Sequence, residues 1–421
     1  MAAVPWVVWI VAAGLRNLPA APEEEASLSA APWQVLRSIT LPVAAPVVGI
    51  AALWVMVSVA AEMTVTDFFQ IRTFAEEVYT QAAAGGFQTD NPIEDYRPWQ
   101  PLVRASGLIG GIGLLATLTV VALVIGHPWL MQANDSRPQS PWLWRLGKGK
   151  LLGAAIPIGV LLLVAGFPVA CLVHEAGISA IRAGDDWQRF WSFEKLLSEL
   201  GRSLDLHSRE LGQTLLLGLT VATASTGLGL LAAWHIRQRC RAPLGFLVLF
   251  ALALAVPGPL LAIAVIHLLN HPIDSFLHPL SIAYDRTLIA PWLVQTVRFT
   301  PVAAIVIAAG FASVPGNLLD AAKSDGAGWA SRLLLIALPM TWPMVVAAWL
   351  VTLALSAGEL AATVLVMPPG PDTLAIQLFK MLHQGADDQV AAMSLVLLSG
   401  VLILAAVAVW LGMQSRKRPP L

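Results

Sequence analysis

The sequence predicts an all-α polytopic membrane protein. Of its 421 residues, 57% are hydrophobic and only 12% are charged, and the mean hydropathy is +0.72. A soluble domain carries about 25% charged residues, so a water-soluble globule of this composition is excluded. The apolar runs are continuous and do not alternate, which disfavours a membrane β-barrel. The net charge of −1 gives no sign of nucleic-acid binding, and two cysteines do not indicate a disulfide scaffold.

About nine segments are long enough, or nearly long enough, to cross a bilayer as helices of about 20 residues. They are 2–15, 43–62, 106–126, 151–173, 211–234, 244–268, 288–311, 341–361 and 391–413. The first is the shortest and could be a signal-peptide core. It lacks a basic residue before its apolar run, because Arg16 comes after it. A helix that enters from outside is therefore the better interpretation.

Charge predicts the orientation. With the N-terminus outside, the inner segments carry 14 Lys and Arg against six acidic residues. Positive charge is retained in the cytoplasm, so this arrangement is favoured. Tryptophans near the predicted interfaces agree with the span boundaries and need no other role. They are Trp142, Trp144, Trp187, Trp191, Trp234 and Trp342.

The chain contains an internal repeat. Residues 23–42 (EEEASLSAAPWQVLRSITLP) and 320–339 (DAAKSDGAGWASRLLLIALP) share an acid, a small residue six positions on, and a final Ile-x-Leu-Pro, each pair 297 residues apart. Glu62 and Glu359 have the same separation. Six predicted spans separate the copies, so the repeat is parallel and both copies lie on the cytoplasmic side. Each copy reads as a short helix and a turn before a proline that opens a span.

The second copy resembles the EAA loop of binding-protein-dependent ABC importer permeases, type 1 (the MetI-like transmembrane family). The resemblance implies that both copies form coupling helices that dock into a cytoplasmic ATPase. The first copy departs more, with Glu23-Glu24-Glu25 for Glu-Ala-Ala and Ser29 for Gly. The residues expected to couple to the ATPase are Asp320, Ala321, Ala322, Gly326, Ile336, Leu338, Pro339, Glu23, Ser29, Ile39, Leu41 and Pro42.

The domain division also follows from this resemblance. Residues 151–421 are expected to be a complete second permease half of six helices. Residues 1–126 are expected to be the last three helices of a first half, and 127–150 a cytoplasmic linker. The chain thus resembles a fused ferric-iron-type permease that is N-terminally incomplete, split or misassigned at its start. Another permease chain could supply the missing helices.

The partners are implied by the family. The sequence has no GxxxxGK[ST] phosphate loop, since Gly147-Lys148-Gly149-Lys150 has the wrong spacing. The resemblance therefore implies a separate cytoplasmic ABC ATPase dimer that binds ATP-Mg, an extracytoplasmic solute-binding protein, and a multi-pass location in the bacterial inner membrane. No cofactor is expected on this chain.

Three ionisable residues are candidates for the translocation pathway or its gate. Arg298 lies about ten residues, roughly 15 Å, inside its predicted span, where a charge should face a partner or a water-filled path. The alternatives for Arg298 are a structural ion pair or a side chain that snorkels to the interface. Glu62 and Glu359 lie at the outer ends of their spans, where their repetition suggests an outer gate or a contact between the halves, although ordinary interfacial carboxylates are favoured over ligands. His267, His271, Asp274 and His278 read as interfacial polar residues and not as a metal site.

The expected function is that of a permease subunit in an ATP-driven importer, with no catalytic residues of its own. An ion-gradient-driven secondary transporter is the alternative. That class also has repeats, but it would be expected to show broken mid-membrane helices and buried acidic residues, whereas the repeated residues here are predicted in the cytoplasm, which favours ATPase docking. Iron is the leading substrate expectation, because EMTVTD (62–67) and RTFAEEVY (72–79) resemble ferric-iron permeases. Thiamine, polyamine, sulfate and phosphonate importers share the same loop. The segment around Trp187–Leu200 is expected to form an interfacial helix on the outer side.

Overall fold

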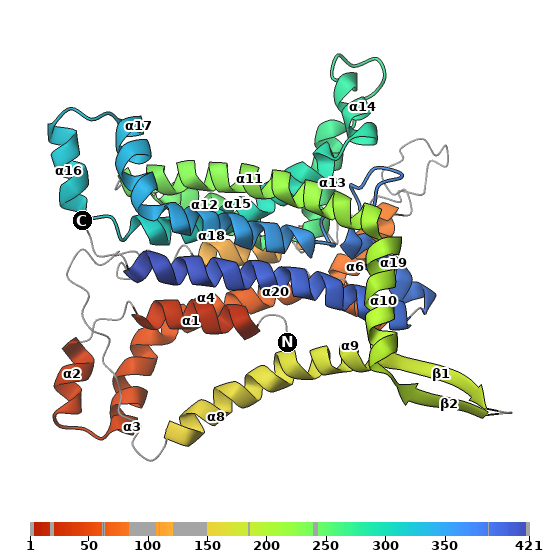
Figure 1. Cartoon of the computed structure of the whole chain (residues 1–421). Helices are drawn as coiled ribbons and strands as arrows, with labels where there is room; N and C mark the ends of the chain where they lie inside the picture. Colours follow the sequence, from red (N-terminus) through yellow and green to blue (C-terminus); the bar gives the residue numbers. More distant parts are fainter. Residues whose placement is uncertain are drawn as a thin grey trace.

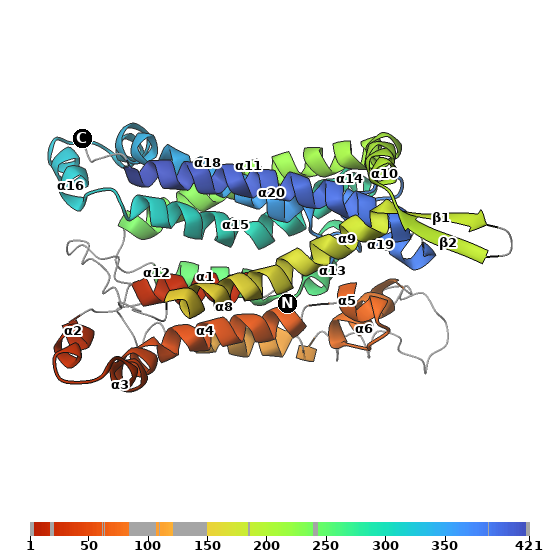
Figure 2. The same cartoon turned by 60° about the horizontal axis from the view of Figure 1, so that its bottom comes forward.

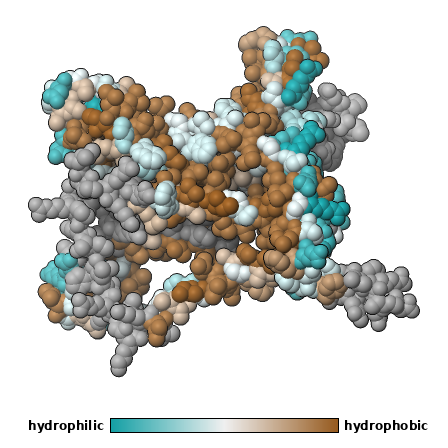
Figure 3. Space-filling view, viewed as in Figure 1, coloured by the Kyte–Doolittle hydropathy of each residue, from teal (hydrophilic) through white to brown (hydrophobic). Residues whose placement is uncertain are grey.

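A computed structural model describes residues 4–16, 21–60, 62, 64–83, 107–108, 110–120, 150–183, 186–238, 243–385 and 387–417. Its long helices run side by side along one direction (Figures 1 and 2). Hydrophobic side chains dominate the middle of the visible face, whereas hydrophilic ones gather towards its two ends (Figure 3). This distribution is the one that a bilayer-spanning bundle requires. The predicted linker 127–150 lies outside the described residues except for Lys150.

Helix is present in every one of the nine predicted segments. The first part of the chain contains α1 (Val4–Arg16), α2 (Ala21–Ser27), α3 (Pro32–Val35), η1 (Leu36–Thr40), α4 (Leu41–Ala60), α5 (Thr64–Phe68), α6 (Phe74–Ala83) and a short apolar helix, Gly110–Val120. The long helices of the second part are α8 (Lys150–Leu161) with η4 (Leu162–Gly166) and α9 (Phe167–Gly177), α11 (Ser208–Gln238), α12 (Pro243–Ala255), α13 (Gly258–Leu269), α15 (Ile289–Phe311), α18 (Leu338–Ala357) and α20 (Asp387–Lys417). Within the described ranges, six helices are long and apolar enough to span, or seven if α12 and α13 count as one.

The prediction of a continuous span over 244–268 was wrong. Helices α12 and α13 meet at an angle of 103°. Pro257 lies between them with φ −57° and ψ 144°, an extended conformation, and it has no N–H to donate to the preceding turn. Gly258 follows, and a Cβ there would lie 2.8 Å from the backbone nitrogen of Ala362. The break therefore depends on a proline and on a glycine that lets another backbone segment approach.

The outer loop after α9 also differs from the prediction. Residues Ile178–Ala183 (β1) and Asp186–Trp191 (β2) form an antiparallel hairpin, and the helix α10 begins only at Phe193 and ends at Leu206. Trp187 is therefore in a strand and not in an interfacial helix. The Trp191 indole nitrogen donates to the Val173 carbonyl at 3.3 Å, which fastens the base of the hairpin to α9.

The internal repeat recurs in the helix pattern. Shifting α4 by 297 residues gives the bounds of α18, and the same shift brings η1 onto Arg332–Ala337 (η5) and α3 onto Trp329–Ser331 (α17). A shift of 300 places α6 on Leu374–Gln384 (α19). Gln70 and Gly370, also 300 apart, both have positive φ, at 57° and 102°. The two copies thus share helices, turns and spacing. The remaining helices are α14 (His278–Arg286) and α16 (Gly316–Ser324).

A proline follows each of the three π-helical segments at the same distance. The segments η1, η4 and η5 each end two residues before a proline, which is Pro42, Pro168 or Pro339. After each segment the next residue donates its N–H to the carbonyl five residues back, as Leu338 does to Leu333. A proline cannot donate to the carbonyl four residues back, and its ring crowds that group. Widening the preceding turn relieves the crowding, so a proline at this spacing is compatible with each of the three π turns.

Small residues allow the central helices to pack closely. Gly229 on α11 faces the backbone of α15: a Cβ there would lie 2.8 Å from the Ala304 nitrogen and 2.9 Å from the Ala303 Cβ. At Gly310 on α15, a Cβ would lie 2.8 Å from the Met344 Cβ of α18. In a membrane, where helix association depends on packing, such small residues set the distance between helices.

We predict that Gly229→Val destabilises the protein by about 1–3 kcal/mol, because its side chain would force α11 away from α15. Gly227→Val is the matched control, since it makes the same change on the same helix at a position with nothing within 4 Å. The measurement is the thermal unfolding midpoint of the detergent-solubilised chain. Equal shifts for the two variants would contradict the proposed close contact.

Candidate functional site

The two repeated loops lie at the same end of the bundle. Helices α2 and α3 and helices α16 and α17 occupy one end in both views, whereas α10 and the hairpin occupy the opposite end (Figures 1 and 2). We call the first the inner end and the second the outer end, following the predicted charge bias. An inner-end location for both loops is the arrangement that a parallel repeat requires.

The predicted coupling residues take matching places in the two copies. Asp320, Ala321 and Ala322 lie on α16, and Gly326 lies in the turn after it. Glu23 lies on α2, and Ser29 lies in the turn that follows. The remaining residues lie where each loop enters its long helix: Ile336 in η5 with Leu338 and Pro339 at the start of α18, and Ile39 in η1 with Leu41 and Pro42 at the start of α4.

Gly326 ends α16 in a conformation that favours glycine. Its φ is +85°, in the left-handed region, and its N–H donates to the Lys323 carbonyl at 3.1 Å. The Ala327 N–H donates to the Ala322 carbonyl at 2.9 Å, which completes a glycine-type helix C-cap. In the first copy, Ala30 N–H donates to the Ala26 carbonyl at 2.9 Å. Ser29 has no positive φ there, so serine costs no strain.

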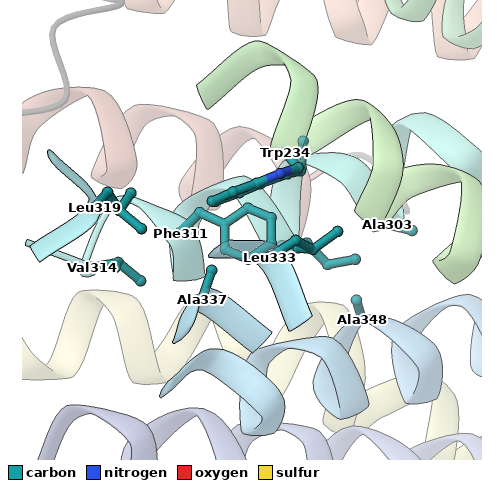
Figure 4. Packing of buried hydrophobic residues seen from close by; sticks show 10 residues of the cluster. Trp234, Ala303, Phe311, Val314, Leu319, Leu333, Ala337 and Ala348 are labelled. Carbon is teal, nitrogen blue, oxygen red and sulfur yellow. The ribbon is translucent and has the colours of Figure 1, made fainter. Parts of the chain in front are cut away.

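Helix α16 has one free side and one anchored side. Asp320, Ala321 and Gly326 are exposed, whereas Leu319 is buried. Leu319 belongs to a hydrophobic cluster that we call the anchor cluster (Figure 4). Its members are Ala233, Trp234, Ala303, Ile307, Phe311, Val314, Leu319, Leu333, Ala337 and Ala348. The cluster draws side chains from α11, α15, α16, η5 and α18, so it joins the loop to three long helices.

Trp234 corrects an expectation from the sequence. We expected it at the membrane interface, but its side chain is fully buried at the centre of the anchor cluster (Figure 4). A lone tryptophan at a span end gives no sign of which face it occupies. The pairing with Phe311, 77 positions later, comes only from the packing of α11 on α15.

The first loop is held by different chemistry. The Thr40 hydroxyl donates to a Glu23 carboxylate oxygen at 2.6 Å, which ties α2 to the end of η1. The residues 297 positions on are Asp320, which is exposed, and Ala337, which has no hydroxyl and lies in the anchor cluster. The position of Thr40, which binds Glu23 by a hydrogen bond in the first loop, is thus taken in the second loop by Ala337, which packs in the anchor cluster.

Two of the three pathway candidates lie together. Arg298 Nε lies 3.4 Å from Glu359 Oε2, with side chains 24% and 10% exposed. The structural ion pair, one of the alternatives that the sequence left open for Arg298, is therefore present. Its Nη1 atom is buried without a partner among the described residues. The structure does not pair Arg298 with Glu62, which lies on the first copy.

The two glutamates share a second role. The Ala362 N–H donates to Glu359 Oε1 at 3.0 Å, and the Val65 N–H donates to Glu62 Oε1 at 3.2 Å. Each carboxylate therefore accepts from the backbone three residues ahead, at the point where a long helix gives way to a turn. This capping contact is a structural role that both acids share.

Gln295 is a buried polar residue that was not among the candidates from the sequence. It lies one helical turn before Arg298 on α15 and is fully buried. Its Nε2 donates to the Thr363 hydroxyl at 2.9 Å, and its Oε1 accepts from the Ser356 hydroxyl. Its spacing of three residues from Arg298 within an apolar span was a usable signal, because both side chains then share a helix face. Gln295 is uncharged, and the pathway candidates from the sequence were all charged residues.

Parts of the chain are similar to known transport proteins. Residues 225–417 match the family model described as "Binding-protein-dependent transport system inner membrane component". The putrescine transport system permease protein PotI of Escherichia coli K12 is 24% identical over 273 residues, which are 62% of this chain and 93% of that protein. A 2-aminoethylphosphonate transport system permease protein, PhnV of Salmonella choleraesuis, is 33% identical over 128 residues, or 29% of this chain and 48% of that protein.

One solved structure is also similar. It is that of a bacterial ABC transporter involved in the import of the acidic polysaccharide alginate. Its TM-score is 0.44 at 18% sequence identity, and the match covers 65% of this chain and 98% of that chain.

We predict that Glu359→Gln and Arg298→Met each destabilise the protein by about 1–3 kcal/mol, because each leaves one charge without its partner in a largely apolar region. Glutamine keeps the oxygen that accepts from Ala362, so the first change removes charge and not the cap. The double variant should cost less than the sum of the single variants. Thermal unfolding of the three proteins measures this, and additive losses would show that the two side chains do not interact.

Proposed function

We propose that this chain is the permease subunit of an ATP-driven importer. The first support is that residues 225–417 match the binding-protein-dependent transport system inner membrane component family. It is a multi-pass protein of the inner membrane. The observation that supports the proposal most directly is geometric. Two loops of matching construction lie at one end of the bundle, and each continues through a π turn into a long apolar helix.

In this proposal the exposed sides of α2 and α16 dock on a cytoplasmic ABC ATPase dimer. The ATPase binds and hydrolyses ATP-Mg, and this chain carries out no chemistry. Closure of the dimer pushes on α16, and the anchor cluster transfers the push to α11, α15 and α18. Leu319 is the residue of α16 that enters the cluster, so it is the point where the push reaches the bundle.

At the outer end the proposal requires a solute-binding protein. The hairpin β1–β2 and helix α10 project at that end and are the candidates for its contact surface (Figure 1). Arg298 and Glu359 then lie on the route from the outer end, either as a gate or as a fixed link between α15 and the end of α18. Another permease chain that contributes further helices is part of the proposed assembly.

The substrate that we propose is a small aliphatic ammonium compound. The two relatives are named for putrescine and 2-aminoethylphosphonate, which both carry a primary amine on a short carbon chain. Ferric iron, the leading expectation from the sequence, finds no support in these names. Uptake assays with labelled putrescine, 2-aminoethylphosphonate and ferric citrate in cells that express the complete system distinguish the three. Uptake of iron alone would reverse the proposal.

An ion-gradient-driven secondary transporter makes a different prediction about energy. Arsenate-treated cells lose ATP while a respiratory ion gradient persists, and a protonophore collapses the gradient while glycolytic ATP persists. An ATP-driven importer loses uptake in the first condition and keeps it in the second. The opposite result would favour the secondary transporter.

We predict that Gly326→Arg reduces uptake at least tenfold and abolishes transport-stimulated ATP hydrolysis, while the chain still inserts. Arginine at φ +85° is strained, and its bulk lies on the exposed side of the loop. The measurements are solute uptake, ATPase activity of the purified complex and the amount of chain in the membrane fraction.

Gly326→Asn is the matched control for this variant. Asparagine adopts positive φ at lower cost than other side chains and is smaller than arginine. It should keep most of the uptake. Wild-type uptake and wild-type ATPase stimulation by Gly326→Arg would count against docking through α16.

A further inference from the structure

The inner end of α11 contacts the second loop on both sides of α16. Trp234 and Arg237 are three residues apart, so they lie on neighbouring positions of one helix face. The Trp234 ring centroid lies 5.4 Å from that of Phe311, the last residue of α15, and 6.5 Å from that of Trp329, the first residue of α17. Both contacts are edge-to-face, a favourable aromatic geometry. One side chain thus bridges the helix before α16 and the helix after it.

Arg237 makes a second contact, with the segment between α15 and α16. Its Nη2 donates to the Val314 carbonyl at 3.0 Å. Val314 is buried and lies between the end of α15 and Pro315, which directly precedes α16. A charge-assisted hydrogen bond at this point fixes the direction in which the chain leaves α15. The sequence accounted for Arg237 only as part of the cytoplasmic excess of positive charge.

We infer that Trp234 and Arg237 are positioning residues that set the orientation of α16 and transmit its displacement to α11. Neither residue is part of the repeated loop, and this inference rests on the proposed function. The loop has few other restraints: Asp320, Ala321 and Gly326 are exposed, and Leu319 is the buried residue of α16. Removing either α11 contact would leave α16 able to tilt about its ends.

The burial pattern supports a positioning role. Trp234 is fully buried and has the largest side chain in the anchor cluster (Figure 4). It lies among Phe311, Leu333 and Leu319, which come from α15, η5 and α16. A rigid aromatic side chain packed on all sides transmits a displacement of one neighbour to the others, because protein interiors are close-packed and barely compressible.

The first experiment measures the loop in this chain alone. Hydrogen–deuterium exchange on the purified full-length chain in lipid nanodiscs compares wild type with Trp234→Ala, Arg237→Ala and Trp342→Ala. The last is the control, since Trp342 is exposed on α18 at the same end of the bundle. We expect exchange of amides 316–331 to rise at least tenfold in the first two variants and to stay within twofold in the control. Unchanged exchange in both variants would overturn the inference.

The second experiment measures coupling in the assembled transporter. We expect Trp234→Ala and Arg237→Ala to lower the number of solute molecules imported per ATP hydrolysed at least fivefold. Trp234→Phe and Arg237→Lys, which keep an aromatic ring and a cationic donor, should restore it to within twofold of wild type. A merely structural role would lower the amount of complex and leave this ratio unchanged, which would also overturn the inference.

The two experiments separate this inference from the proposed function. If wild-type chain drives no ATP-dependent uptake, the proposed function fails, while the exchange measurement still decides whether α11 holds the loop. If Trp234→Ala does not fold, Arg237→Ala and its lysine rescue decide both readouts, since Arg237 is only half-buried.

Discussion

The close packing of α11 against α15 and α18 is the constraint on which the rest of the structure depends. Lipid offers helices no hydrophobic reason to associate, so contact area and small residues decide which helices stay together. Gly229 and Gly310 allow a neighbouring helix to approach at positions where any side chain would collide. Trp234 can meet Phe311 only because α11 and α15 are held at this distance, and the loop between α15 and α18 inherits its position from that contact.

Irregular backbone occurs in the bundle where protein covers it. The break between α12 and α13 packs against the turn region after Glu359, where Gly258 approaches Ala361 and Ala362. Ala75 and Val78 of α6 cover the same place from the first part of the chain, in contact with Leu260 and Val364. Unpaired backbone groups are tolerated at membrane depth only in such surroundings or beside water. The first and second copies therefore meet where the second is least helical.

The sequence predicted what depends on local pattern. Apolar run length located all nine helical segments, and the matched Ile-x-Leu-Pro positions predicted two loops on one side. The need for a small residue at Gly326 also followed, and its positive φ gives the reason. What depends on contacts between distant segments was not predictable. The break at Pro257 needs the backbone at 361–362 to fill it, and the burial of Trp234 needs Phe311 and Trp329 around it.

Helices α15 and α18 are linked at both ends, and this has a consequence for the proposed mechanism. At the inner end the anchor cluster joins them, and in the outer half of α15 Arg298 and Gln295 contact Glu359 and Ser356. Polar links in apolar surroundings are costly to break, because each group would be left without a partner. A push on α16 delivered to one of the two helices is therefore resisted at the far end by the other. Under the proposed mechanism this geometry favours rocking of α15 and α18 as one unit over a movement that spreads them apart, and the Arg298–Glu359 pair would be one of the links that hold the unit together.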